Sequence, residues 1–183
     1  MNRCEKSAFR LKSAIWVLPV TVVLVMGMLP GGGVYADDCR VSSRVTQFGR
    51  IVRGTSHNDL IDCSDATAGH TIVGGGDNDN IAGGFGNDTI DGGTGDDNIS
   101  GGPSGIDNGN DNLSGGAGND YIVGGGGDDT ISGGTGSDSL NGDDGNDALS
   151  GPPNDNAMDI LDGGPGNDSC ARGGGDMLTS CNP

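Results

Sequence analysis

A period of nine residues runs through most of the chain and constrains its fold more than any other feature. Read in nines, residues 83–100 give GGFGNDTID and GGTGDDNIS, and residues 115–150 give GGAGNDYIV, GGGGDDTIS, GGTGSDSLN and GDDGNDALS. Thirteen such units fit between residues 54 and 179. Two of them carry insertions, and two others (63–73 and 172–179) are degenerate. Repetition at so short a fixed period predicts a solenoid, in which each unit packs only against its neighbours.

Position 8 of the unit is the one regularly apolar position. It holds Cys170 in one unit and a large aliphatic residue in the other twelve: Ile61, Ile72, Ile81, Ile90, Ile99, Leu113, Ile122, Ile131, Leu140, Leu149, Leu161 and Leu178. One apolar residue between small or polar neighbours predicts a three-residue strand with a single inward side chain. Glycine at positions 1, 2 and 4 predicts tight turns, because glycine adopts positive φ and lets backbones approach closely.

Position 6 is aspartate in twelve of the thirteen units, and only His70 interrupts this column. Its fixed phase, two residues before the apolar position, argues against a merely solvated acidic surface. Aspartates stacked above one another in a solenoid cannot all remain charged and unpaired. A hard divalent cation removes the conflict, and Ca²⁺ suits flexible sites of carboxylate and carbonyl oxygens better than Mg²⁺ does. The sequence therefore predicts calcium as a ligand that drives folding.

The composition agrees with a cation-dependent fold. The 183 residues include 39 glycines and 26 acidic against 9 basic residues, which gives a formal net charge of −17, and aromatic residues make up 3%. Without cations such a composition is typical of a disordered acidic segment, which we expect for the calcium-free protein. The negative charge also argues against nucleic acid as a partner, because phosphate would be repelled.

Motifs of common enzyme classes do not occur. The chain has no H-E-x-x-H, no G-x-S-x-G and no phosphate-binding lysine motif. His57 and His70 stand at repeat positions 4 and 6, and we interpret both as substituted repeat residues rather than as ligands of a transition metal. Segment 37–53, ahead of the repeats, is shorter than a catalytic domain. We therefore expect no enzymatic activity and no catalytic residue.

The first 36 residues have the pattern of a secretory signal peptide. Residues 1–13 carry four basic side chains, residues 14–29 are mostly apolar, and Val34 and Ala36 suit cleavage after Ala36. The apolar run is shorter than the roughly 20 residues that a membrane span needs. We therefore expect a secreted, extracellular protein that does not insert into a membrane after cleavage.

Four cysteines follow the expected cleavage point: Cys39, Cys63, Cys170 and Cys181. An even number in an exported protein predicts disulfides. Three connectivities are possible, and nearness in the sequence favours Cys39–Cys63 together with Cys170–Cys181. Residues 180–183 are then expected to form a short tail held by a disulfide.

The unit GGxGxDxUx, in which U is a large aliphatic residue, resembles the calcium-binding nonapeptide of RTX, or hemolysin-type, proteins. The resemblance covers residues 54–179 and implies an all-β, right-handed parallel β-roll (a β-solenoid) with two units per coil, preceded by a cap segment at 37–53. It implies that each Ca²⁺ lies between turns two units apart, bound by position-6 carboxylates and glycine-rich backbone carbonyls. Charge counting suggests about eight ions. The implied ligands are Asp59, Asp79, Asp97, Asp120, Asp138 and Asp159 on one edge, and Asp88, Asp111, Asp129, Asp147 and Asp168 on the other.

The biological role of such a roll is less constrained than its calcium chemistry. We expect a structural or interaction role at a cell surface or matrix. One alternative is ice binding, which some related calcium-dependent repeats perform through ranks of Thr and Asx residues, but position 3 has threonine only at Thr94 and Thr135. A non-catalytic subunit of a secreted enzyme is a third alternative. Typical RTX proteins lack cysteines and use a C-terminal export signal, so this chain departs from the family in both respects.

Overall fold

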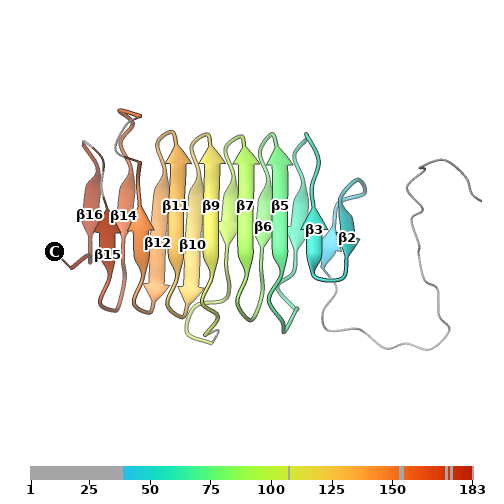
Figure 1. Ribbon diagram of the computed structural model, residues 1–183, viewed down its shortest axis with the longest axis horizontal. Coiled ribbons are helices and arrows are strands. Elements are labelled where there is room, and N and C mark those ends of the chain that lie inside the picture. Colours follow the sequence, from blue (N-terminus) through green and yellow to red (C-terminus); the bar gives the residue numbers. More distant parts are fainter. Residues whose placement is uncertain (1–38, 107, 153–154, 172, 174, 183) are drawn as a thin grey trace, which may run out of the picture. The chain divides into compact units, whose positions relative to one another are not determined.

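The computed structural model describes residues 39–106, 108–152, 155–171, 173 and 175–182. They belong to one compact unit, 34–183. The expected signal peptide, 1–36, lies outside the described residues. Within these residues the chain forms sixteen strands and no helix (Figure 1). Accordingly, this part of the chain contains no helix that is long and apolar enough to cross a membrane.

The strands form two eight-stranded sheets. The first sheet contains, in spatial order, β1 (Arg40–Val41), β4 (Leu60–Asp62), β6 (Asn80–Ala82), β8 (Asn98–Ser100), β10 (Tyr121–Gly126), β12 (Ser139–Asp144), β14 (Ile160–Asp162) and β16 (Met177–Thr179). The second sheet contains, in the same direction, β2 (Thr46–Phe48), β3 (Ile51–Arg53), β5 (Thr71–Gly76), β7 (Thr89–Thr94), β9 (Asn112–Ala117), β11 (Thr130–Thr135), β13 (Ala148–Ser150) and β15 (Ser169–Ala171).

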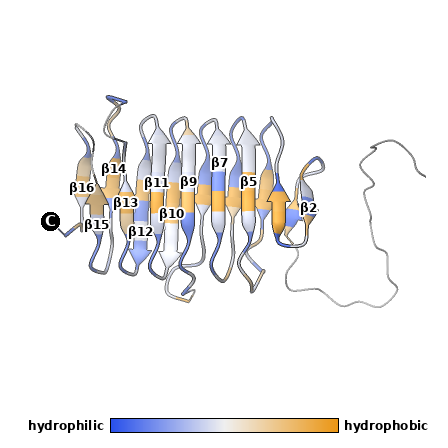
Figure 2. Cartoon of the chain, viewed as in Figure 1, coloured by the Kyte–Doolittle hydropathy of each residue, from blue (hydrophilic) through white to orange (hydrophobic). Residues whose placement is uncertain are grey.

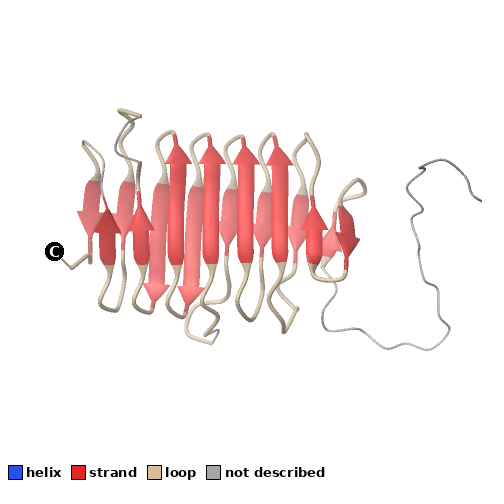
Figure 3. Ribbon diagram, in the orientation of Figure 1, coloured by secondary structure: helices blue, strands red, loops and turns tan. Residues whose placement is uncertain are grey.

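Successive units alternate between the two sheets, so each strand pairs with the strand two units later. The pairing is parallel from β4 to β16 in one sheet and from β3 to β15 in the other. Position-8 residues stand in register, as Ile81 with Ile99 and Ile72 with Ile90 show. The glycine-rich turns therefore line the two edges where the chain crosses between sheets (Figure 3). This arrangement confirms the all-β, parallel β-roll with two units per coil.

The core is a double column of position-8 side chains between the sheets. Figure 2 shows the apolar residues as a band across the middle of the strands. Ile61, Ile131 and Leu161 are typical, each at most 1% exposed. Each unit contributes one inward side chain to the core. The core therefore stays continuous as long as every unit has an aliphatic residue at position 8. Val52 of β3 pairs with Ile72 and is fully buried. The core therefore begins within segment 37–53, which the sequence predicted to be a cap.

Six strands are longer than the three residues that the pattern predicts. β5, β7, β9, β10, β11 and β12 each continue through positions 1 to 3 of the following unit. Gly93 pairs with Gly116 within this extension, and both have positive φ (109° and 111°), which glycine adopts without strain. The pattern missed the extension because glycine is rarely a strand residue.

The two ends of the roll are built differently. At the N-terminal end, β1 and β2 pair antiparallel with β4 and β3, and a disulfide joins Cys39 to Cys63. At the C-terminal end, a disulfide joins Cys170 to Cys181, and an isolated parallel bridge places Asn182 beside β15. These disulfides have the connectivity that nearness in the sequence favours.

Candidate metal centre

Two columns of buried carboxylates run along the two edges of the roll. Each aspartate at position 6 stands immediately before a strand, so the turn delivers it to the edge while position 8 enters the core. In both columns these side chains are at most 6% exposed. The structure places all eleven sequence-predicted residues in the two expected columns: Asp59, Asp79, Asp97, Asp120, Asp138 and Asp159 on one edge, and Asp88, Asp111, Asp129, Asp147 and Asp168 on the other.

One oxygen of each carboxylate is held by the preceding coil. The backbone N–H of Asp79 donates to Oδ1 of Asp97 at 2.8 Å, and the N–H of Asp120 donates to Oδ1 of Asp138 at 2.9 Å. The opposite column repeats the bond, with the N–H of Asp111 donating to Oδ1 of Asp129 at 2.8 Å. This hydrogen bond therefore orients each carboxylate before any ligand binds. The same bond recurs from coil to coil.

The second oxygen has no hydrogen-bond donor in much of the array. A buried carboxylate oxygen without a partner is strongly unfavourable, because it has lost water and gained nothing in return. Such an oxygen indicates that a ligand is needed to complete its surroundings. The Oδ2 atoms in this condition, fully buried and without a hydrogen-bond partner, belong to Asp79, Asp97, Asp120, Asp138, Asp147, Asp159 and Asp168.

Glycine at position 1 keeps open the space beside this second oxygen. A Cβ on Gly142 would lie against Oδ2 of Asp147 and 2.6 Å from the carbonyl oxygen of Gly163 in the next coil. A carboxylate oxygen and a backbone carbonyl oxygen thus converge where a side chain would otherwise begin. Both are hard oxygen ligands of the kind that Ca²⁺ prefers. The residues present therefore fit a calcium ion, whose double charge would offset the stacked carboxylates.

Burial changes the acidity of these carboxyl groups in the metal-free fold. Desolvation by burial, reinforced by neighbouring aspartates, raises the pKa of Asp79, Asp120, Asp138 and Asp147 to about 6. It also raises the pKa of Asp97 and Asp159. In each case the hydrogen bond from the preceding backbone N–H opposes the shift without cancelling it. Ionised columns are thus unfavourable until positive charge is supplied.

Comparison with protein families decides the assignment. The family model of the RTX calcium-binding nonapeptide repeat matches four stretches, residues 73–103, 106–140, 123–151 and 159–176, which together cover more than half of the chain. The chain belongs to the RTX repeat family. Comparisons with curated proteins and with solved structures gave no match. The matched stretches contain most of the two columns and leave out the worn units before residue 73.

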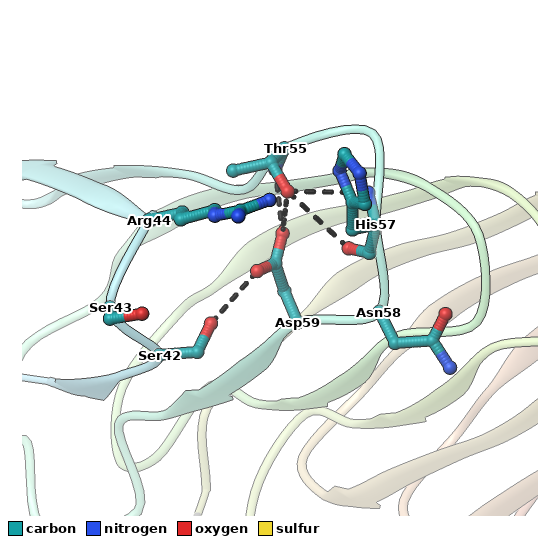
Figure 4. Close-up of a pocket in the computed structure, with 7 residues that line it drawn as sticks. All are labelled: Ser42, Ser43, Arg44, Thr55, His57, Asn58 and Asp59. Carbon is teal, nitrogen blue, oxygen red and sulfur yellow. Dashed lines mark hydrogen bonds between the residues drawn. The ribbon is translucent and has the colours of Figure 1, made fainter.

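The first carboxylate of one RTX column differs from those that follow. Ser42 Oγ donates to Oδ1 of Asp59 at 2.8 Å, and Thr55 donates to Oδ2 through its N–H at 2.6 Å and its Oγ1 at 2.9 Å (Figure 4). Burial by itself would raise the pKa of Asp59, but these hydrogen bonds outweigh it and lower the pKa. The protein thus satisfies both oxygens at this end, in a pocket that Arg44 and His57 also line.

The same column closes in a similar way at the other end. Asp176 accepts hydrogen bonds from the N–H of Asp159 at 3.2 Å and from the N–H of Gly173 at 2.5 Å. Its two oxygens are therefore both used by backbone amides. In the column from Asp59 to Asp176, the protein itself therefore supplies hydrogen bonds to both carboxylate oxygens at each end, whereas the interior carboxylates have an Oδ2 without a donor.

The opposite column begins with His70 in place of an aspartate. His70 is 2% exposed, and its backbone N–H donates to Oδ1 of Asp88. Its ring Nδ1 lies 3.8 Å from the same oxygen. Cys39 and Cys63 approach His70 closely enough to resemble a metal site. Their sulfur atoms, however, are bonded to each other and so are not thiolate ligands.

A second row of hydrogen bonds, at position 5, was not predicted from the sequence. The N–H of Asn146 donates to Oδ1 of Asp128 at 2.9 Å, and the N–H of Asp128 donates to Oδ1 of Asn110 at 3.0 Å. Asn119 and Asp96 repeat the arrangement on the other edge, at 2.7 Å. These side chains are exposed, so they tie the turns together on the solvent side of the aspartate columns. The signal was present as the recurrent Asn, Asp or Ser directly before the position-6 aspartate.

Proposed function

We propose that this RTX protein is secreted and that calcium, bound along both aspartate columns, drives the roll to fold outside the cell. Eleven of the twelve position-6 aspartates, all except Asp176, are the proposed ligands, completed by backbone carbonyl oxygens of the glycine-rich turns, and we propose about eight ions. The folded roll then serves as an extracellular structural or interaction element rather than as an enzyme.

The observation that carries this proposal is the set of buried Oδ2 atoms without hydrogen-bond partners. Oδ2 of Asp97 and of Asp120 are buried in successive coils of one column. The carbonyl oxygen of Gly115 lies beside the position that a Cβ of Gly92 would take, next to Oδ2 of Asp97. Carboxylates of neighbouring coils repel one another, as Asp97 and Asp138 repel Asp120. A cation between coils converts that repulsion into the attraction that holds the coils together.

Two further features support an extracellular site of action. RTX repeats are typical of secreted proteins, and disulfides such as Cys39–Cys63 and Cys170–Cys181 persist mainly in oxidising compartments. Extracellular calcium modules bind with dissociation constants of about 10⁻⁴ to 10⁻³ M. A chain with such affinity would remain unfolded where calcium is scarce and would fold after export.

The decisive experiment follows folding and calcium uptake together. Circular dichroism of the chain beginning at Asp37 should report little ordered structure in chelator and a β spectrum on addition of millimolar CaCl₂. Isothermal titration calorimetry should detect several ions per chain, and MgCl₂ at equal concentration serves as the control that should not induce folding. A β spectrum in chelator at neutral pH, or no heat of calcium binding, would contradict the proposal.

Ice binding is retained as a second candidate because of one exposed row on the β3–β15 sheet. Thr71, Thr89, Asn112 and Thr130 are exposed and stand in register on adjacent strands. The row at position 3 is less regular, since Gly76, Thr94 and Ala117 alternate there. Thermal hysteresis of the calcium-loaded chain distinguishes this candidate, because a purely structural roll would produce none.

A further inference from the structure

Positive charge is concentrated at the N-terminal end of the roll. Residues 39–57 contain four arginines and no acidic residue, whereas from Asn58 onward aspartates recur throughout and Arg172 is the one basic residue besides His70. Arg40 pairs with Asp62 and Asp65. The other three, Arg44, Arg50 and Arg53, are exposed and make no ion pair with any residue in the described part of the chain. We call this end, residues 40–60, the head.

Exposed apolar side chains gather at the same end and at the opposite one. On the head, Phe48 is 89%, Ile51 45% and Leu60 53% exposed. The far end of the roll, residues 155–171 and 175–182, is called the tail. It carries Met158, Ile160, Met177 and Leu178, each between 38% and 56% exposed. Between the two ends, the described residues expose only two other large apolar side chains, Ile106 and Tyr121. Apolar surface concentrated in this way marks interaction sites.

The tail is also where the core column lies open. Leu178 occupies position 8 but is 38% exposed, whereas Leu161 on the neighbouring strand β14 is fully buried. Among the described strands, β16 pairs with β14 alone, so its other backbone edge can accept a strand, while β15 is partly covered by Asn182. Solenoids normally close their ends with a polar cap, and the described tail has none over Leu178.

We propose that the head of one copy docks on the tail of the next. The tail carries the acidic residues Asp155, Asp162 and Asp176, whereas the one acidic residue of the head, Asp59, is buried. Both surfaces present apolar side chains and an edge strand. Two tails or two heads would bring like charges together, so the observations favour a head-to-tail contact. Such a contact joins different surfaces and, when it does not close into a ring, produces a linear filament.

Sedimentation velocity of the chain from Asp37 onward in millimolar calcium tests this proposal. The wild-type chain should form concentration-dependent oligomers that dissociate as NaCl is raised, because exposed charge pairs are screened. A head variant, Arg44→Ser with Arg50→Ser and Arg53→Ser, should associate about tenfold more weakly, and a tail variant, Ile160→Ser with Met177→Ser, should also weaken association. Tyr121→Ser, exposed midway along the roll, is the control that should assemble like the wild type.

Mixing the two variants gives the sharpest outcome. At protein concentrations close to the wild-type dissociation constant each variant should be largely monomeric alone, yet each keeps one intact end, so the mixture should form mainly a one-to-one dimer. Circular dichroism and calcium uptake equal to the wild type establish that both variants are folded. A wild-type monomer at all concentrations, a variant that associates as strongly as the wild type, or association that strengthens with salt would overturn the proposal. Binding of the tail variant, which keeps the head intact, to vesicles of anionic phospholipid would overturn the proposal in favour of a membrane partner.

Discussion

The backbone N–H of Asp97 donates a hydrogen bond to Oδ1 of Asp120 at 2.8 Å, although the two residues are 23 positions apart. Asp79 makes the same bond to Asp97 across 18 positions, also at 2.8 Å. The longer separation arises because the unit at 101–114 carries a five-residue insertion, which the turn absorbs without displacing the column. The spacing of carboxylates along the edge is therefore fixed by coil stacking rather than by distance along the chain.

Replacing a column aspartate by its amide should remove calcium. Asp120→Asn keeps an oxygen for the N–H of Asp97 but replaces the charged Oδ2 side of the group, so calcium affinity should fall at least about tenfold and fewer ions should bind, as measured by calorimetry. Asp128→Asn is the matched control, because Oδ1 of Asp128 accepts the backbone N–H of Asn146, and an asparagine Oδ1 accepts the same bond elsewhere, as Asn110 does from Asp128. Equal losses in both variants would contradict the assignment of position 6.

Acidification should stabilise the calcium-free roll. The pKa of Asp79, Asp120, Asp138 and Asp147 is about 6 in the fold against 3.8 as the ordinary value, so the folded state binds more protons between these limits. The stabilisation is complete below about pH 4 and is lost as the pH rises through 6. Circular dichroism of metal-stripped protein from pH 3.5 to 8 should show ordered structure decreasing along this range.

Saturating calcium should reverse that dependence, since protons then compete with the ion for the same oxygens. The calcium-loaded roll should become less stable as the pH falls through the ordinary aspartate pKa of 3.8, measured by thermal unfolding in excess CaCl₂. A calcium-free chain that gains structure on raising the pH would show that the columns are not the responsible groups.

Glycine at position 1 should be essential for close approach of the coils. In Gly83→Ala the new Cβ would overlap the carbonyl oxygen of Gly101, a backbone atom that cannot move away freely, so we expect a loss of about 1–3 kcal/mol and weaker calcium binding. Gly76→Ala is the control, because its Cβ would lie 3.2 Å from the movable Oγ1 of Thr94. Chemical unfolding in calcium compares the two, and similar losses would argue against this role.

Core truncation should depend on the place of the residue along the roll. Ile131→Ala in the middle should destabilise the calcium-loaded roll by about 2–5 kcal/mol, because its side chain is 1% exposed and leaves a cavity between two coils. Leu178→Ala at the tail should cost clearly less in the monomer, since that side chain is 38% exposed. Urea unfolding at low protein concentration measures both, and an equal cost would mean that Leu178 is covered in solution.

The sequence alone determined the repeat, the inward position 8 and the two columns of position-6 aspartates. A period of nine with two units per coil fixes these features, because the side-chain direction alternates along each short strand and equivalent units stack two apart. The same pattern predicted which aspartates share an edge, for example Asp79 with Asp97 and Asp88 with Asp111.

Only the tertiary structure decided how each carboxylate is used. It assigns Oδ1 of Asp97 to the amide of Asp79 and leaves Oδ2 buried without a donor, whereas Ser42 and Thr55 satisfy both oxygens of Asp59. It also shows that Leu178, identical in repeat position to buried Leu161, lies at an open end. The reason is that these differences depend on which residues from other coils are in contact, and a nine-residue pattern describes every coil as if it had the same neighbours.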